Sequence, residues 1–311
     1  MKKTAGIHHI TAIVGNPQQN VDFYAGILGL RLVKKTINFD DPGTYHLYFG
    51  DEDGRPGTAI TFFPWDGGHR GKVGDGQVAV TSFVIPKGSM TFWETRLARF
   101  DVAFSKEMRF GEQSLQFHDP HGIALELVAR DEGTASTWHF GGITSDAAIK
   151  GFGGAVLGSI QPQQTGKLLE KVMGLARLGE ENGYIRFRSE ADLGNVIDVK
   201  QTPSERGRMG VGTVHHIAFR VQDDTDQLEW KQYLEANGFG VTPVQDRNYF
   251  HSIYFREFGG ILFEMATDGP GFAIDEAKDR LGEKLMLPPQ YEELRPRLEE
   301  ILQPIAVRTL D

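Results

Sequence analysis

The fold is decided by two stretches of sequence that resemble each other: Gly6-Ile7-His8-His9-Ile10-Thr11-Ala12-Ile13 and Thr213-Val214-His215-His216-Ile217-Ala218-Phe219-Arg220. Each is a short apolar run with alternating character around a His-His pair, which is typical of a β-strand. A stretch with apolar residues at helical spacing follows each of them, residues 16–29 and residues 227–238. Both stretches end in glycine, a common helix stop, so each copy predicts a strand and then a helix.

Three predicted strands follow each of these helices. They cover residues 30–37, 44–49 and 58–63 in the first copy and residues 240–244, 251–255 and 261–266 in the second. Two segments in the middle of the chain, residues 78–128 and 155–200, fit the same strand–helix–three-strand template less closely. Four copies of one unit indicate a repeat protein whose units form two pairs.

The repeats predict the domain organisation. We expect an N-terminal domain, residues 1–132, with units at about 1–68 and 75–132, and a linker at 133–150. We expect a C-terminal domain, residues 151–273, with units at about 151–203 and 210–273. Residues 274–311 lie outside the repeat and are expected to be a helical tail, with helices at 274–281 and 291–302 on either side of two prolines.

Composition excludes several classes of protein. The formal net charge of -9 gives no basic surface for nucleic acid, and the absence of cysteine excludes disulfides, thiolate nucleophiles and iron–sulfur clusters. The basic N-terminus has no long apolar run after it, and no stretch approaches the length of a transmembrane helix. We therefore expect a cytoplasmic protein without a membrane or nucleic-acid partner, for which a homo-oligomer is possible.

The two His-His pairs indicate a site. An isolated histidine in a strand is usually a core residue, but two pairs at matching positions of a repeat are harder to explain in that way. Adjacent side chains of a strand point to opposite faces, so one histidine of each pair can face the concave side of the sheet. We expect the other histidine of each pair to lie behind or beside it and to support it.

Glu264 supplies a third group, since it lies in the apolar stretch Gly260-Ile261-Leu262-Phe263-Glu264-Met265-Ala266. A carboxylate that is buried, ionised and unpaired costs several kcal/mol, and a bound metal would remove that cost. The alternative is a salt bridge with Arg247 or Arg256. Together with the two histidine pairs, the interpretation as a metal ligand is favoured.

Two imidazoles and one carboxylate form the ligand set of non-haem iron(II) enzymes, in which open positions remain for substrate and O₂. Zinc with two histidines and one glutamate is the competing interpretation. The H-E-x-x-H signature of zinc proteases is absent, which argues against a protease.

The surroundings of Glu126 resemble those of Glu264. The stretch Gly122-Ile123-Ala124-Leu125-Glu126-Leu127-Val128 is also an apolar run that contains one glutamate. The first strands of the two middle units carry no histidine; we align the histidine positions with Thr81-Ser82-Phe83 and Gly154-Ala155-Val156. We interpret that half of the chain as having lost its ligands. His118 and His121 lie nearby, and the sequence assigns them no role.

The chain resembles the vicinal oxygen chelate superfamily, which includes glyoxalases and extradiol dioxygenases, and within it the ring-cleaving hydroquinone dioxygenases and their Bacillus relatives from quinone-response operons. The resemblance covers the whole chain and rests on four segments taken together: residues 6–11, 38–50, 212–218, and 246–250 continuing into 254–257. It implies an α+β fold in which four βαβββ units form two paired, cupped mixed β-sheets.

The resemblance also implies a metal site built by the first and fourth units, with His9, His216 and Glu264 as ligands. It places five further residues around the metal in catalytic roles: His8, Thr11, His215, Arg247 and Tyr254. Without it we would interpret Tyr254 as a core aromatic and Arg247 as a surface charge. The second glutamate ligand of glyoxalase I would fall near Phe62-Phe63, which cannot bind metal, and this argues against a lyase of that type.

The expected function is an iron(II)-dependent ring-cleaving dioxygenase that uses O₂ on a hydroquinone- or catechol-type aromatic, in aromatic catabolism or quinone detoxification. Manganese(II) and zinc(II) are alternative metals. One alternative function is a metal-dependent glyoxalase-like lyase, isomerase or thiol transferase on the same fold. Another is a non-enzymatic binding protein for an aromatic compound.

Overall fold

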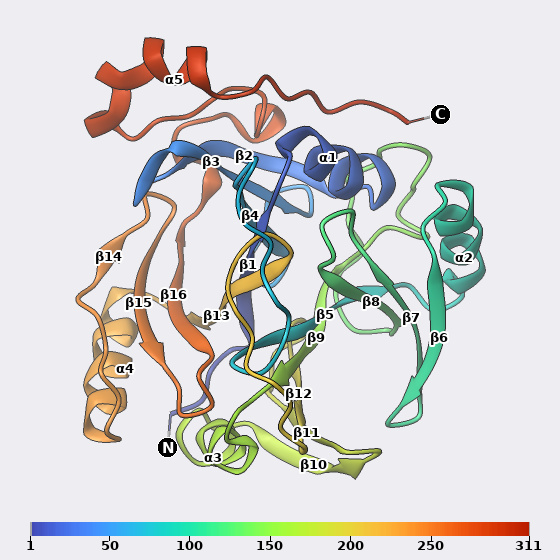
Figure 1. Cartoon of the computed structure of the whole chain (residues 1–311), viewed down its shortest axis with the longest axis vertical. Helices are drawn as coiled ribbons and strands as arrows, with labels where there is room; N and C mark the ends of the chain where they lie inside the picture. Colours follow the sequence, from blue (N-terminus) through green and yellow to red (C-terminus); the bar gives the residue numbers. More distant parts are fainter. Residues whose placement is uncertain (1, 311) are drawn as a thin grey trace.

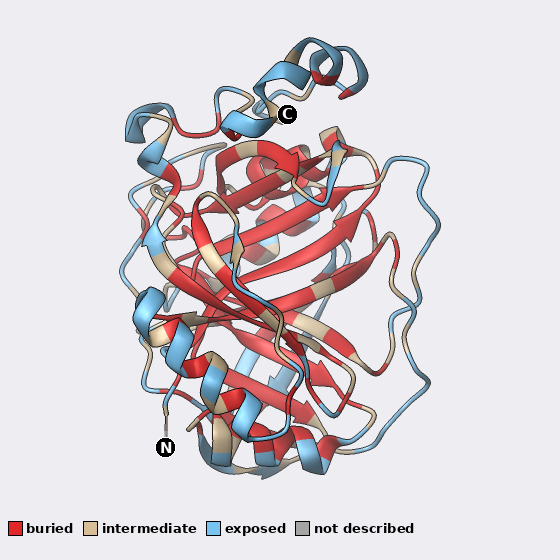
Figure 2. Ribbon diagram, turned by 90° about the vertical axis from the view of Figure 1, so that its left-hand side faces the viewer, coloured by how far each residue is buried: buried red, intermediate tan, exposed pale blue. Residues whose placement is uncertain are grey.

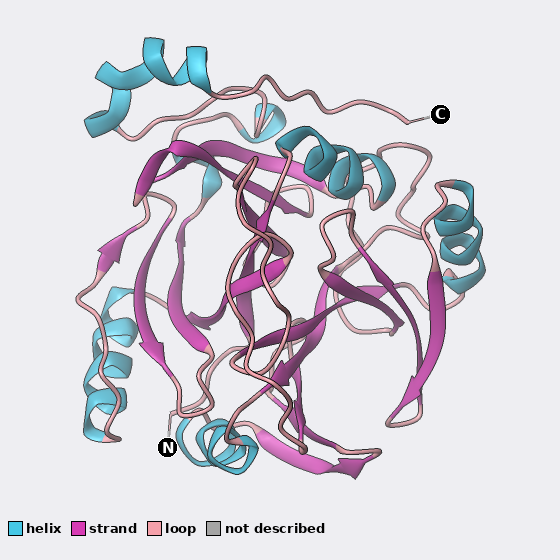
Figure 3. Cartoon of the chain, in the orientation of Figure 1, coloured by secondary structure: helices cyan, strands magenta, loops and turns pink. Residues whose placement is uncertain are grey.

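The computed structural model describes residues 2–310, which form two eight-stranded mixed sheets that curl strongly (Figure 1). The first sheet has the order β14-β15-β16-β13-β1-β4-β3-β2 and the second the order β10-β11-β12-β9-β5-β8-β7-β6. Figure 3, which is coloured by secondary structure, shows that strands predominate and that helices are few. The fold class expected from the sequence is confirmed.

The strands of the first sheet are β1 (Ile7–Val14), β2 (Arg31–Asn38), β3 (Asp41–Gly50), β4 (Ala59–Pro64), β13 (Thr213–Val221), β14 (Gln245–Asp246), β15 (Phe250–Arg256) and β16 (Leu262–Pro270). The strands of the second sheet are β5 (Gln77–Ile85), β6 (Phe104–Arg109), β7 (Glu112–His118), β8 (Ala124–Ala129), β9 (Gly151–Gly158), β10 (Ala176–Glu181), β11 (Tyr184–Arg188) and β12 (Val196–Lys200). The first sheet therefore joins the first and fourth units, and the second sheet joins the second and third. The division of the chain into halves at residues 133–150 stays a prediction.

Each unit has the same internal pairing. Its first and last strands run parallel side by side, as in β1–β4 and β13–β16, because the helix between them carries the chain back across the sheet. Two units then meet through their first strands, which pair antiparallel as β1–β13 in one sheet and β5–β9 in the other. The centre of the first sheet therefore carries both His-His pairs.

Both central strand pairs contain bulges at equivalent places. In β1–β13 the register skips His8 on one strand and His215 on the other. In β5–β9 it skips Ala79 and Gly153. A bulge adds one residue to a strand and redirects the side chains around it, so the first histidine of each pair is the extra residue of a bulge.

The helices lie at the periphery (Figure 1) and agree with the helices expected from the repeat. They are α1 (Pro17–Val21), which continues as a π-helical segment (Asp22–Ile27); α2 (Met90–Arg99); α3 (Pro162–Lys167), which also continues as a π-helical segment (Leu168–Val172); and α4 (Asp224–Ala236). Asn16 caps the first helix by accepting a hydrogen bond from the Gln19 backbone N–H at 3.0 Å, and Asp223 caps α4 in the same way. No helix among residues 2–310 is long and apolar enough to span a membrane.

Two edges of the sheets differ from the strands expected from sequence. Residues 240–244 form only an isolated bridge between Val241 and Phe255, and the edge strand is the short β14 instead. The edge strand β10 was not expected, because its residues are mostly exposed and give no alternating apolar pattern. Pairing with β11, rather than burial, defines this strand.

The tail is less helical than expected. Residues 274–281 form only short 3-10 turns, Phe272–Ile274 and Lys278–Arg280, while Pro289–Leu294 and α5 (Arg295–Ile301) are helical. The reason is Lys34, whose side chain is fully buried and bonds to Asp275 Oδ1 and Glu276 Oε2, both at 2.6 Å. An unpaired buried ammonium is costly, so this pairing holds the tail in an irregular path.

The tail packs on the body beside β2 and β3, as the position of α5 in Figure 1 shows. The Met286 backbone N–H donates to the Lys35 carbonyl at 2.9 Å, and the Tyr291 hydroxyl donates to the Phe39 carbonyl at 2.8 Å. Figure 2 shows that the tail is mostly exposed, with a few buried residues. Four leucines of the tail are buried: Leu281, Leu287, Leu298 and Leu302.

Removal of residues 272–311 is expected to destabilise the protein strongly. Burying one leucine contributes about 1.5–3 kcal/mol, and the truncation removes four buried leucines together with Asp275 and Glu276, the ion-pair partners of the buried Lys34. The melting temperature should fall by on the order of 10 °C. Val307→Ala, at an exposed position of the same tail, is the control; an unchanged melting temperature in the truncated protein would contradict the packing role.

Candidate metal centre

Three side chains from adjacent strands of the first sheet converge. His9 lies on β1, His216 on β13 and Glu264 on β16, and one ligand atom of each lies within 4.8 Å of the others. The Nε2 atoms of the two histidines are 3.2 Å apart, and the Glu264 Oε2 atom is 2.9 Å from His216 Nε2 and 3.3 Å from His9 Nε2. All three side chains are buried, and the structure brings these residues together although they lie far apart in the chain.

The bulged histidines set the orientation of the two rings. His8 Nδ1 is 2.9 Å from His9 Nδ1, and His215 Nδ1 is 2.8 Å from His216 Nδ1. We assign the protons so that His9 and His216 donate from Nδ1, because their Nε2 atoms then present lone pairs to the centre of the cluster. This is the support that a metal-binding histidine usually receives through its second nitrogen.

Glu264 fits the same interpretation. The Ser252 hydroxyl donates to its Oε1 atom, while Oε2, which faces the two histidines, has no hydrogen-bond donor. Two imidazole lone pairs and a carboxylate oxygen so close together in a buried place repel one another unless a cation lies between them. The residues present therefore fit a divalent metal.

The alternative salt bridge to Glu264 is not formed. Arg247 Nη2 lies 3.1 Å from Asp40 Oδ2, and Arg256 donates to the Gly260 carbonyl at 2.6 Å. Pairing with a protonated His216 is disfavoured as well, because burial lowers the pKa of that histidine.

A cavity of about 380 Å³ opens beside the cluster, and His9 and His216 form part of its wall. Aromatic side chains dominate the rest of the lining: Phe39, Tyr48, Phe63, Trp65, Phe250 and Tyr254. A mostly apolar cleft with a few convergent polar groups is the usual form of a small-molecule site.

Two polar residues expected from the resemblance also line this cavity. Arg247 donates from Nε to the Tyr254 hydroxyl at 3.1 Å, and the Tyr254 ring lies 5.7 Å from the ring of His216. Burial raises the pKa of Tyr254. Burial acts to lower the pKa of Arg247, but Tyr254 and Asp40 raise it, so the tyrosine stays protonated and the arginine charged.

The two bulged histidines have different surroundings. His215 lines the cavity, whereas His8 Nε2 lies 3.1 Å from the Thr267 carbonyl and His8 borders a separate cavity on the other side. Burial and the neighbouring ligand histidine lower the pKa of each to about 3, so both are neutral. Thr11 does not line the cavity; its hydroxyl lies 2.8 Å from that of Thr61.

Two cavity residues were missed by the reasoning from sequence. His46 and Tyr48 both lie on β3 and line the cavity, and the Tyr48 hydroxyl is 2.8 Å from His46 Nδ1. The signal available in the sequence was the segment 38–50, which carried part of the family resemblance but received no role.

The strand register corrects two sequence alignments. The bulges place Ala79-Val80 and Gly153-Gly154, rather than the stretches chosen from sequence, where the His-His pairs stand in the first sheet. The position equivalent to Glu264 in the first unit is Thr61, not Phe62-Phe63, as the pairing of β4 with β1 shows. Neither correction supplies a further ligand.

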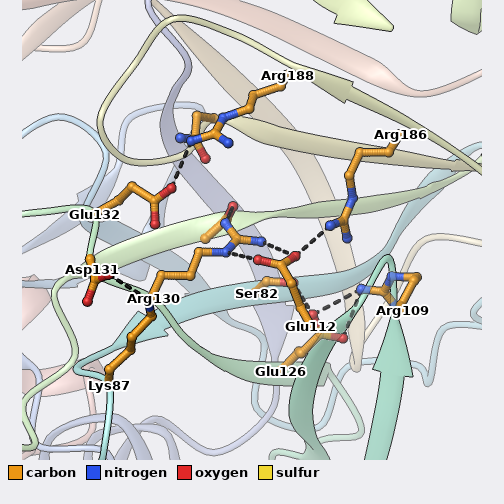
Figure 4. A network of polar contacts seen from close by, with 12 residues as sticks. Ser82, Lys87, Arg109, Glu112, Glu126, Arg130, Asp131, Glu132, Arg186 and Arg188 are labelled. Atoms are coloured by element: carbon orange, nitrogen blue, oxygen red, sulfur yellow. Dashed lines mark hydrogen bonds and ion pairs between the residues drawn. The ribbon is translucent and has the colours of Figure 1, made fainter. Parts of the chain in front are cut away.

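Glu126 lies in the second sheet, where arginines take the place of a metal (Figure 4). Arg109 bonds to Glu126 Oε2 at 2.9 Å and to Asp198 Oδ2 at 2.7 Å, and Arg186 bonds to Asp198 Oδ1 at 2.8 Å. Within residues 2–310 the first sheet holds the one cluster of metal-ligand type. His118 and His121 lie outside that cluster, and His121 Nδ1 accepts from the Gly15 backbone N–H.

Comparisons with known proteins agree with this geometry. Residues 6–127 and 156–265 match the model of the Glyoxalase/Bleomycin resistance protein/Dioxygenase superfamily. The chain is 64% identical over 310 residues to "Putative ring-cleaving dioxygenase MhqO" of Bacillus subtilis (strain 168), covering 100% of this chain and 99% of that protein. A crystal structure of a "putative dioxygenase" from the same species, also 64% identical, superposes with a TM-score of 0.99 and full coverage of both chains.

A more distant relative has a more specific name. The chain is 34% identical over 309 residues to the chlorohydroquinone/hydroquinone 1,2-dioxygenase of Sphingobium indicum, covering 96% of this chain and 95% of that protein. Both relatives are therefore matched over almost their whole length.

Proposed function

Because the chain belongs to the glyoxalase/bleomycin resistance protein/dioxygenase superfamily, we propose that it is an iron(II)-dependent dioxygenase that cleaves the ring of a hydroquinone- or catechol-type aromatic. The observation that carries the proposal is the convergence of His9, His216 and Glu264 beside an aromatic-lined cavity. When bound, iron(II) would supply open coordination positions and redox chemistry for the reaction of the ring with O₂.

Tyr254 and Arg247 are suited to orient the substrate. Since the Tyr254 oxygen accepts a hydrogen bond from Arg247 Nε, its own hydroxyl hydrogen is free to donate to a substrate oxygen. The guanidinium charge favours an anionic oxygen on the substrate. These two residues thus recognise a phenolate, the form that a hydroquinone takes when it loses a proton.

His215 is the histidine best placed to donate a hydrogen bond to the substrate. Because its Nδ1 accepts from His216, its proton resides on Nε2, and the residue lines the cavity. His8 has the same tautomer, but its Nε2–H donates a hydrogen bond to the Thr267 carbonyl. We therefore assign to His215 hydrogen-bond donation to a substrate oxygen, and to His8 the role of holding the ring of His9.

The size of the cavity favours a substituted ring. A cavity of about 150 Å³ is large enough for benzene, so about 380 Å³ leaves room for substituents. The aromatic side chains around it would pack against the faces of such a ring. This supports substituted hydroquinones as the class to test first.

Oxygen uptake distinguishes the proposal from its rivals. Protein purified without air and loaded with iron(II) is mixed with substituted hydroquinones, and O₂ consumption is recorded with an oxygen electrode. We expect consumption that depends on both metal and substrate. A lyase, isomerase, transferase or binding protein would consume no O₂, and that outcome with every hydroquinone would refute the proposal.

Tyr254→Phe is expected to lower turnover efficiency roughly ten- to a hundredfold, because a hydrogen bond to a charged partner contributes about 1.5–3 kcal/mol. Arg247→Lys should also be impaired, since lysine lacks the planar fork that holds Tyr254. The measurement is steady-state O₂ uptake by metal-loaded variants, together with their metal content, which neither change should lower.

Tyr233→Phe is the matched control, because it removes the same hydroxyl from α4, away from the cavity lining. It should retain the efficiency of the unmodified protein. Unchanged efficiency in both Tyr254→Phe and Arg247→Lys would remove these residues from the site.

A further inference from the structure

Thr61 occupies a position that carries a carboxylate in the other three units. In the first sheet Thr61 pairs with Thr11, two residues after His9, and Glu264 pairs with Ala218, two residues after His216. In the second sheet the equivalent residues are Glu126, opposite Ser82, and Asp198, opposite Val156. The register shows this equivalence, and the sequence pattern around Thr61 does not.

A chain of neutral groups holds Thr61 in place. Its side chain is fully buried, and its hydroxyl lies 2.8 Å from Thr11 Oγ1 and 2.9 Å from His46 Nε2. The other ring nitrogen of His46 is 2.8 Å from the Tyr48 hydroxyl, and the rings of Tyr48 and Phe63 lie 4.1 and 4.4 Å from the ring of His46. His46 and Tyr48 both line the cavity. This chain of hydrogen-bonding groups therefore connects Thr61, the residue equivalent to Glu264, with the cavity.

We propose that Thr61, held by His46, is a positioning residue that keeps a fourth ligand position free, so that a substrate oxygen atom takes the place where a second carboxylate would bind. The inference rests on the proposed metal centre. With one carboxylate, a site that holds a divalent cation has a net charge of +1, which attracts an anionic substrate oxygen; a second carboxylate would cancel that charge.

The chemistry of the neighbouring groups agrees with this role. A glutamate at position 61 would lie next to His46 Nε2, on the strand that pairs with the strand of His9. A hydroxyl can donate to or accept from His46 without bringing a charge. Thr61 therefore excludes a competing anion from the place that the substrate needs.

Metal affinity tests the proposal without any turnover. Thr61→Glu, Thr61→Gln and the unmodified protein are titrated with Mn²⁺ alone, and the free ion is followed by electron paramagnetic resonance. Thr61→Glu is expected to bind Mn²⁺ at least about tenfold more tightly, because it adds a carboxylate ligand. Thr61→Gln, of equal size and without charge, should stay within about threefold of the unmodified protein. If circular dichroism shows that Thr61→Glu is unfolded, the shorter pair Thr61→Asp and Thr61→Asn replaces it.

A second comparison tests the hydroxyl itself. Thr61→Ser keeps the hydrogen bond to His46 and should retain activity, while Thr61→Val keeps the shape and should raise KM for the hydroquinone about tenfold, with unchanged Mn²⁺ affinity. If the unmodified protein binds Mn²⁺ no better than His9→Ala does, both the metal centre and this proposal fail. Tight binding in the unmodified protein that neither acidic variant strengthens, or a Thr61→Val variant with unchanged KM, overturns this proposal alone.

Discussion

Replacing His9, His216 or Glu264 by alanine is expected to reduce tightly bound metal from a stoichiometric amount to background. Each side chain provides one of three converging ligand atoms, and two ligands retain a divalent ion far less well than three. Activity should be lost together with the metal. The measurement is metal content after dialysis, determined by mass spectrometry for each purified variant.

Glu126→Gln is the control for this set, because Glu126 is the other glutamate in a matching strand and is paired with Arg109 instead of facing histidines. It should retain the metal. A Glu264→Ala variant that keeps a stoichiometric amount of metal, or a Glu126→Gln variant that loses it, would show that the ligand set is wrong.

Arg109→Ala is expected to destabilise the protein by about 3–5 kcal/mol, because it leaves the buried Glu126 without its arginine and Asp198 with Arg186 alone. Arg109 bonds to Glu126 (Figure 4) and also to Asp198, and all three side chains are largely buried. This loss would come from the second sheet, which binds no metal in our interpretation. Chemical unfolding measures it as the free energy of unfolding.

Lys87→Ala is the matched control, since Lys87 also forms an ion pair, with Asp131, but both side chains are exposed. Its free energy of unfolding should change by no more than about 0.5 kcal/mol. Equal effects of the two substitutions would contradict the idea that the arginines neutralise buried carboxylates there.

The repeat, the two His-His pairs and Glu264 could be singled out from the sequence for a physical reason, while the choice of His9 and His216 within the pairs came from the family resemblance. His9 and His216 stand at equivalent places of two copies of one unit, and repeated structure brings equivalent strands together at the centre of a sheet. Glu264 was recognisable because an ionisable group is conspicuous in an apolar strand. Arg247 and Tyr254 carried no such signal, and the family resemblance alone pointed to them.

The bulges, by contrast, could not be predicted, because they depend on how β1 and β13 pair, and these strands are distant in the chain. The equivalence of Thr61 with Glu264 likewise depends on strand pairing, that of β4 with β1 and of β16 with β13, and the sequence alignment pointed to phenylalanines instead. His46 was missed for a related reason: its role depends on contacts across β3 and β4 rather than on its neighbours in sequence.

The tail shows a similar limit. Its leucines gave a helical pattern, but the pairing of Lys34 with Asp275 and Glu276 overrides that local preference. A fully buried lysine in β2 cannot be recognised from sequence, since lysine is normally exposed.

The central claim is that the metal centre adds O₂ to an aromatic ring. Mass spectrometry of the product formed from a substituted hydroquinone under ¹⁸O₂ by the iron(II)-loaded protein tests it most directly. A dioxygenase is expected to give a ring-opened product that contains both atoms of one O₂ molecule, with allowance for oxygen exchange with water. A product of unchanged mass, or a quinone without added oxygen, would contradict the claim.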